Sequence, residues 1–351
     1  MLHRVLLPFE PDELARIFAL QQQLLQLACN VRQIDRQALE NHFDSEEIVN
    51  WIMNSYPRTI GPLNNFARNC SPQTKQEIIQ ELENDYGFWE HREDPNFNFV
   101  FDATTEHREI IGLWLRGYFD QFGRGVDEAI TTTRFLNKQI WLEAFRNANP
   151  HLRTCPACDG TMSGGITVEH FLPRSLFPVL SVHVANLIPI CEHCNNPKGN
   201  NNPLENASLQ EILLPYHLHA LDVGNIHISR DGEGNYEFSF EPKEQLTDIT
   251  KPVQEFDALF KIPSRWNNRN GNRTIIDTAI AKVQEQVDAD KDDDIDISNQ
   301  ENFLTRIRAM CNRLESNWGR QPNFVPATAW LNWTLTNTPN ALWNKFQDQI
   351  I

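Results

Sequence analysis

The apolar positions of the first 150 residues recur with the spacing of amphipathic helices. Over Leu14–Val31 they recur every three or four residues, which predicts one buried helical stripe. Ser71-Pro72 is typical of a helix start, so a helix is expected over Gln73–Glu83. The same spacing returns over Val126–Asn147. These patterns predict a helical N-terminal region, 1–150, whose apolar stripes pack in a core.

The pattern changes after residue 203. Asn225–Ser229 and Tyr236–Phe240 alternate apolar and polar residues on either side of a turn that contains Asp231-Gly232, which predicts a β-hairpin. Helical spacing follows from Phe256 onward, resuming over Asn302–Asn317 and near Ala327–Phe346. The region 204–351 is therefore expected to be a hairpin followed by helices.

Asp288–Asp296 interrupts this helical region with six aspartates and one lysine. Such a run of like charges predicts a solvated loop. A calcium site is the alternative, but the spacing lacks the glycine and the terminal glutamate of an EF-hand.

Composition separates the chain into three parts. The 351 residues have a net charge of −16, which argues against a protein that coats nucleic acid without regard to sequence. The excess acid lies in 1–150 and 204–351, whereas 151–203 has three basic and three acidic residues and four of the seven cysteines. We therefore expect three regions with these bounds. No apolar run approaches the length of a membrane span, and the chain is expected to be cytoplasmic.

Two Cys-x-x-Cys pairs mark the central region. Cys155 and Cys158 precede Cys191 and Cys194 by 32 intervening residues. Two such pairs can surround one ion tetrahedrally, so a structural Zn²⁺ site is expected. A redox dithiol or two disulfides are weaker alternatives, because a cytoplasmic chain keeps its thiols reduced. The other cysteines are expected to be small buried apolar residues or to lie in loops: Cys29, Cys70 and Cys311.

The residues between and after the two pairs form a more specific pattern. Glu169-His170-Phe-Leu-Pro173 is followed by Asn186-Leu187 and then by Cys194-Asn195-Asn-Pro-Lys198. This order resembles the HNH endonucleases, the ββα-metal nucleases, over about 50 residues (Cys155 to Pro203). The resemblance implies a zinc-bound ββα-metal core. Together with the patterns of the flanking regions, it predicts a mainly α chain with a small α+β insert, in which this core lies between the helical N-terminal region and the C-terminal hairpin and helices.

The resemblance also implies the roles of the site residues. His170 would activate the attacking water, and its ordinary pKa suits a base at neutral pH. Asn186 would bind the imidazole and fix its tautomer. Glu169 and Asn195 would hold a catalytic Mg²⁺ or Mn²⁺. Neighbours on a regular strand face opposite ways, so Glu169 and His170 reach one metal only if the strand bends; Glu169 could instead pair with Arg174 or Lys198.

Four basic residues are candidates for contact with nucleic acid. Lys198 lies three residues after Asn195, on the same helical face, and Arg174 lies in the loop after the proposed base. Arg265 and Arg269 belong to an acid-free stretch, 258–276, although Asn270-Gly-Asn makes a continuous helix there doubtful. Each of these cations could instead be solvated or paired with an acidic flank.

The function expected from the resemblance is metal-dependent hydrolysis of nucleic acid, DNA more than RNA. The flanking regions and the form of the motif are similar to nucleases of bacterial anti-phage defence, Septu-type or retron-associated, in which a second protein such as an ATPase controls the nuclease. The alternative is a zinc-stabilised interaction module with an inactive HNH site. A zinc-based transcription factor fits less well, because no basic recognition helix adjoins the cysteines.

Overall fold

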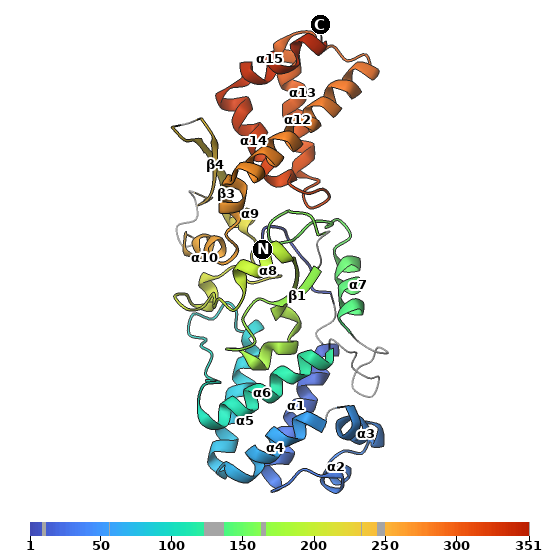
Figure 1. The fold of residues 1–351 in the computed structure, drawn as a ribbon, viewed down its shortest axis with the longest axis vertical. Helices are drawn as coiled ribbons and strands as arrows, with labels where there is room; N and C mark the ends of the chain where they lie inside the picture. Colours follow the sequence, from blue (N-terminus) through green and yellow to red (C-terminus); the bar gives the residue numbers. More distant parts are fainter. Residues whose placement is uncertain are drawn as a thin grey trace.

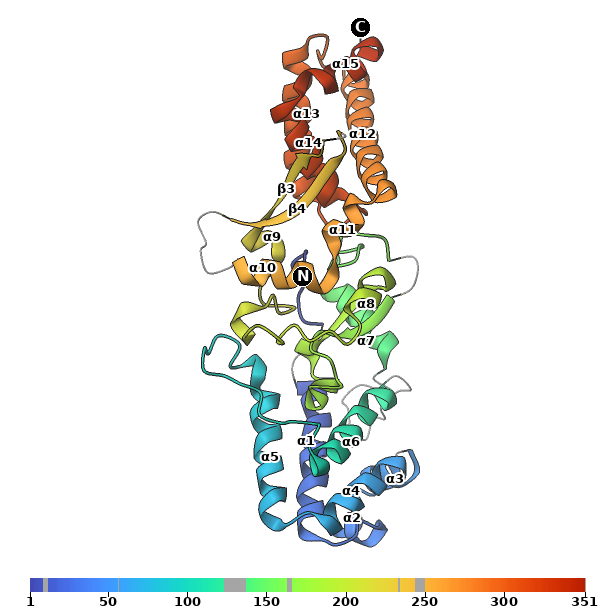
Figure 2. The same cartoon turned by 60° about the vertical axis from the view of Figure 1, so that its left-hand side comes forward.

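Three groups of elements follow one another along an elongated molecule. At one end lie the N-terminal helices, in the middle a small ββα unit, and at the other end the last four helices (Figure 1), an arrangement that the turned view in Figure 2 repeats. The computed structural model describes residues 1–8, 12–55, 57–122, 137–162, 166–232, 234–243 and 250–350.

The N-terminal region is helical, as predicted. Ser71 caps one of the helices, since its hydroxyl accepts a hydrogen bond from the amide of Thr74 at 3.1 Å. Of the helix predicted over Val126–Asn147, residues 126–136 lie outside the described residues, and the remainder is helical. The helices are α1 (Asp12–Asn30), α2 (Arg36–His42), α3 (Glu46–Ser55), α4 (Pro57–Asn69), α5 (Pro72–Tyr86), the 3₁₀ turn η1 (Gly87–Trp89), α6 (Glu106–Phe122) and α7 (Lys138–Ala148).

The central unit is a two-stranded antiparallel sheet followed directly by a helix. Its strands pair so that His170 lies opposite Leu187. The loop between them contains two 3₁₀ turns, and α6 packs against the first of these. The elements are β1 (Ile166–His170), η2 (Pro178–Val182), η3 (Val184–Asn186), β2 (Leu187–Cys191) and α8 (Glu192–Lys198).

The C-terminal region contains the predicted hairpin, preceded by a 3₁₀ turn and a short helix; the buried Ile228 and Phe238 lie opposite each other in it. Helices follow, and the loop predicted at Asp288–Asp296 is wrong in part because α12 continues to Asp292. The elements are η4 (Leu209–Glu211), α9 (Ala220–Val223), β3 (Gly224–Arg230), β4 (Tyr236–Pro242), α10 (Thr250–Phe260), α11 (Ile262–Asn267), α12 (Arg269–Asp292), α13 (Gln300–Glu315), α14 (Phe324–Asn337) and α15 (Pro339–Ile350).

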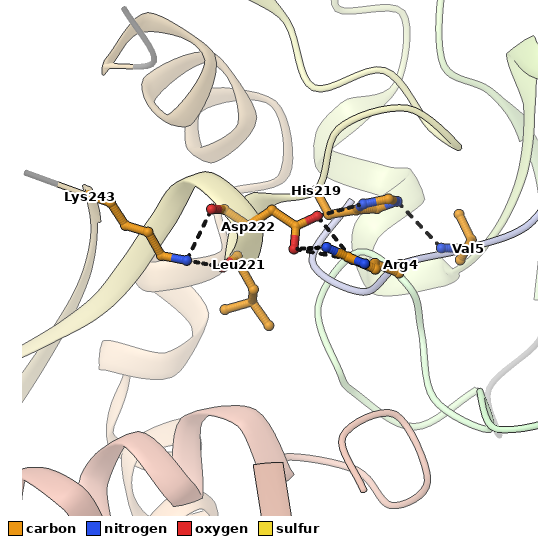
Figure 3. A network of polar contacts seen from close by, with 6 residues as sticks. All are labelled: Arg4, Val5, His219, Leu221, Asp222 and Lys243. Carbon is orange, nitrogen blue, oxygen red and sulfur yellow. Dashed lines mark hydrogen bonds and ion pairs between the residues drawn. The ribbon is translucent and has the colours of Figure 1, made fainter. Parts of the chain in front are cut away.

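Residues 1–8 run through the middle of the molecule and join regions that are distant in sequence. Arg4 donates two nitrogens to the carboxylate of Asp222, which also accepts from Nδ1 of His219 at 3.1 Å. Figure 3 shows this network, in which Nζ of Lys243 binds the carbonyl oxygens of Leu221 and Asp222 from the other side. The segment is thus held between the central unit and the hairpin.

In the part of the chain that the structure describes, no helix combines the length and the apolar character that crossing a membrane requires.

Candidate active site and metal centre

The four paired cysteines converge on one point, as their spacing predicts. The sulfurs of Cys155 and Cys194 are 3.9 Å apart, those of Cys158 and Cys191 are 3.7 Å apart, and all four lie within 4.8 Å of one another. A tetrahedron of sulfurs around Zn²⁺ has edges of about 3.8 Å, given Zn–S bonds of about 2.3 Å. All four side chains are buried, so these residues fit a closed structural zinc site.

The cysteine cluster receives a positive charge from outside the central region. Nη2 of Arg265, in α11, donates to the sulfur of Cys194 at 3.2 Å. With a Zn²⁺ ion bound, this guanidinium would offset part of the negative charge of four thiolates. The expected contact of Arg265 with nucleic acid is not supported, because this side chain faces the cysteines.

Asp159 fastens the turn after the first cysteine pair to the rest of the protein. Its carboxylate is fully buried and accepts hydrogen bonds from Nε2 of His3 at 2.8 Å and from the hydroxyl of Thr154 at 3.1 Å. The second carboxylate oxygen accepts from the amide of Val325 at 2.8 Å, in the first turn of α14. One side chain therefore joins the turn of the first cysteine pair, the N-terminal segment and a C-terminal helix.

His170 lies at the end of β1 with its ring buried. Nε2 is 2.9 Å from the carbonyl oxygen of Ser181, and because a carbonyl only accepts, Nε2 bears the proton. Nδ1 is then the nitrogen that can accept a proton. Burial lowers the pKa of His170 to about 3, so the imidazole is neutral at neutral pH.

Asn186 does not bind the imidazole, which corrects the expected role. Its amide oxygen accepts from the backbone nitrogen of Leu172 at 2.7 Å, and its nitrogen donates to the carbonyls of Leu172 and Leu180 at 3.0 and 3.2 Å. Both amide protons are thereby used. Asn186 instead fixes the loop that contains Ser181, whose carbonyl in turn orients His170.

Glu169 points away from His170, as on a regular strand. In β1 the side chain of His170 is buried and that of Glu169 is partly exposed. One carboxylate oxygen of Glu169 accepts from Nζ of Lys198 at 3.0 Å, and the Lys198 side chain is 0% exposed. The alternative that Glu169 pairs with Lys198 is thus confirmed. The expected contact of Lys198 with a phosphate does not occur, because its ammonium is buried.

Asn195 lies in α8 one turn before Lys198, on the helix face that meets β1. Its side chain is partly exposed, and no hydrogen bond of that amide is found among the described residues. Glu169 and the amide oxygen of Asn195 are oxygen donors of the kind that Mg²⁺ or Mn²⁺ prefers. Among the described residues, the cysteines form the one cluster of three or more His, Cys, Asp or Glu side chains that could hold an ion.

The two remaining basic candidates lie in different places. Arg174 is near His170, where its guanidinium donates to Asp120 at 3.1 Å. Arg269 is exposed at the start of α12 and lines a hollow beside the hairpin. The doubt about a continuous helix over this stretch is confirmed, although the break falls at Asn268, between α11 and α12.

Three residues of the site were not identified from the sequence. Phe119 and Asp120 belong to α6, and Lys138 is the first residue of α7. The Phe119 ring packs edge-on against His170, with centroids 4.2 Å apart. In the sequence these residues belong to ordinary helical patterns, and only tertiary packing brings them to the site.

A scan against protein-family models and searches of curated proteins and of solved structures give no match for this chain.

Proposed function

We propose that this protein is a metal-dependent endonuclease of the HNH type, with His170 as the general base. The observation that supports this most is the placement of His170 at the end of β1, with Nε2 bound to a carbonyl and Nδ1 left to accept a proton. A strand, a strand and a helix follow in the order that the motif implies, with the zinc cysteines at their ends. The order of these elements and the placement of His170 support the proposal.

In this proposal the side chains divide the work of hydrolysis. His170 accepts a proton from water through Nδ1, the nitrogen that bears no proton. Burial lowers the pKa of the ring to about 3, which makes it a weaker base than the ordinary histidine that the sequence predicted. Glu169 and Asn195 would hold a divalent cation, which when bound would neutralise charge on the phosphate and on the leaving oxygen. Because Glu169 faces away from His170 in this structure, both can act on one phosphate only if the end of β1 bends. Asn186 and Ser181 keep the imidazole in the required orientation and tautomer.

The wider setting of the proposal rests on the motif alone. The form Glu169-His170-Phe-Leu-Pro-Arg-Ser175 resembles defence nucleases, so we propose a regulated effector of bacterial anti-phage defence that acts on DNA. A protein partner, such as an ATPase, would release its activity. A cleavage assay with and without the candidate partner tests this extension separately.

The alternative is a zinc-stabilised interaction module without catalysis, and two contacts favour it. The ring of Phe119 covers His170, and Lys198 occupies one oxygen of Glu169. In such a module, the zinc site would be essential for folding, whereas replacing His170 would not change the rate at which DNA is cleaved in the assay.

Cleavage of supercoiled plasmid in Mg²⁺ or Mn²⁺ separates the two functions. His170→Ala is expected to lower the cleavage rate by about 100-fold or more, the usual effect of losing a general base. His193→Ala is the matched control, because this exposed histidine lies between Cys191, the last residue of β2, and Cys194 in α8, and has no part in the proposed chemistry. Equal rates for wild type and His170→Ala, with and without a candidate partner, would refute the nuclease.

A further inference from the structure

Side chains from three separate elements meet over His170. Phe119 and Asp120 come from the end of α6, Lys138 from the start of α7, and Arg174 from the loop after β1. Phe119 is buried and covers the imidazole. The entrance to the proposed nuclease site is therefore formed by residues outside the 151–203 region as well as within it.

Two cations flank the ring of Phe119. Nζ of Lys138 is 4.3 Å from the ring centroid and the guanidinium carbon of Arg174 is 5.3 Å from it. Both cations act electrostatically on His170, so they lie close to the proposed reacting groups. Two positive groups held around one ring form a site suited to an anion.

Asp120 supplies the anion in this structure. Its carboxylate accepts from Nη1 of Arg174 at 3.1 Å and interacts electrostatically with Lys138. A phosphodiester presents the same unit charge and the same kind of acceptor oxygens to these cations. The carboxylate thus resembles a phosphate in both charge and hydrogen bonding.

The contact is weak compared with other ion pairs of the molecule. Asp120 and Arg174 share one hydrogen bond, and their side chains are 63% and 39% exposed. Arg306 instead binds Asp290 through two nitrogens, and that carboxylate is 2% exposed. An exposed pair contributes little to stability, so a polyanion can displace Asp120 readily.

We propose that Lys138 and Arg174 form a binding site for a DNA phosphate at the entrance to the nuclease site, and that Asp120 occupies it as an internal competitor. The identity of the anion as DNA rests on the proposed function; the competition between carboxylate and phosphate does not.

The test measures binding of the full-length protein to a short fluorescein-labelled DNA duplex by fluorescence anisotropy, without added divalent cation. Asp120→Asn removes the competitor and is expected to tighten binding about three- to fivefold, the size of effect expected for an exposed ion pair. Lys138→Gln is expected to weaken binding about fivefold and to reduce the salt slope of log K by about one.

Two matched variants control for net charge alone. Glu109→Gln removes a carboxylate from an exposed position of the same helix, α6, and Lys345→Gln removes an exposed ammonium from α15. Both are expected to change the dissociation constant by less than a factor of two, since neither lies near the site. The proposal is overturned if Asp120→Asn matches wild type or Glu109→Gln, or if no variant binds DNA.

Cleavage of plasmid by the same proteins separates this proposal from the nuclease. If the binding shifts occur but no protein cleaves DNA in Mg²⁺ or Mn²⁺, the phosphate site stands and the nuclease fails. If cleavage depends on His170 while Asp120→Asn and Lys138→Gln bind like wild type, the nuclease stands and the phosphate site fails.

Discussion

Asp159→Ala is expected to remove the main connection between the turn of the first cysteine pair and the two ends of the chain. Val325 N–H and His3 Nε2–H lose a buried acceptor, whereas the hydroxyl of Thr154 keeps the carbonyl of Gly319 at 3.3 Å. Two buried donors left without a partner cost about 2–6 kcal/mol together. Asp159 also has φ = 59°, where an alanine costs about 1 kcal/mol more.

The expected loss is therefore about 3–7 kcal/mol, a large part of the stability of an ordinary domain. Asp159→Asn is the milder comparison, because asparagine tolerates a positive φ and its amide oxygen can still accept from Val325. We expect it to cost about 1–2 kcal/mol, the difference between charged and neutral hydrogen bonds.

Urea unfolding followed by circular dichroism gives both values, with zinc content measured on the same samples. If Asp159→Ala does not fold, the asparagine variant still provides a free energy of unfolding. A loss below about 1 kcal/mol for the alanine variant would show that water or another side chain replaces the carboxylate, and the reasoning would be wrong.

Three other changes test the remaining features. Cys194→Ser is expected to abolish stoichiometric zinc, measured by mass spectrometry, and to lower the melting temperature; zinc retained at one per chain would contradict the four-sulfur site. Burial lowers the pKa of His183 to about 3, so below pH 6.5 the unfolded chain binds a proton that the folded chain refuses. As the pH is lowered below 6.5, His183 should therefore reduce the free energy of unfolding by about 1.4 kcal/mol per pH unit. His183→Asn should make the free energy of unfolding, measured by urea unfolding, less dependent on pH in this range, and an unchanged pH dependence would refute the reasoning. Glu169→Gln leaves the buried ammonium of Lys198 unpaired and should cost about 3–5 kcal/mol, largely recovered in the double variant with Lys198→Met; a cost below about 1 kcal/mol would mean that the ammonium reaches water.

The elements that were predictable from sequence are those whose signals are local. Ser71 before Pro72, the alternation on both sides of Asp231-Gly232, and the two cysteine pairs each specify a nearby structure through spacing and hydrogen bonding. The mainly helical fold, the hairpin and the convergence of the four cysteines follow from such signals. The secondary structure at these positions is determined by neighbouring residues more than by tertiary contacts.

The errors concern residues whose role depends on a distant partner. Asp290 lies in α12 and not in a loop, and its buried carboxylate binds Arg306 on the next helix. Asn186 binds backbone groups rather than His170 because a tight loop brings them to its amide. The same limitation hid Lys138, since nothing in its own helix indicates that the site lies beside it.

The path of residues 1–8 has a consequence for how the chain acquires its structure. This first segment forms hydrogen bonds across 143 to 218 residues of sequence, to Asn149, Asp159 and Asp222. Residues 1–8 are synthesised before any of these partners, and Asp222 follows Arg4 by 218 residues. Contacts of such high sequence separation slow folding. We expect refolding kinetics in which the local helices form first and the middle of the molecule closes last.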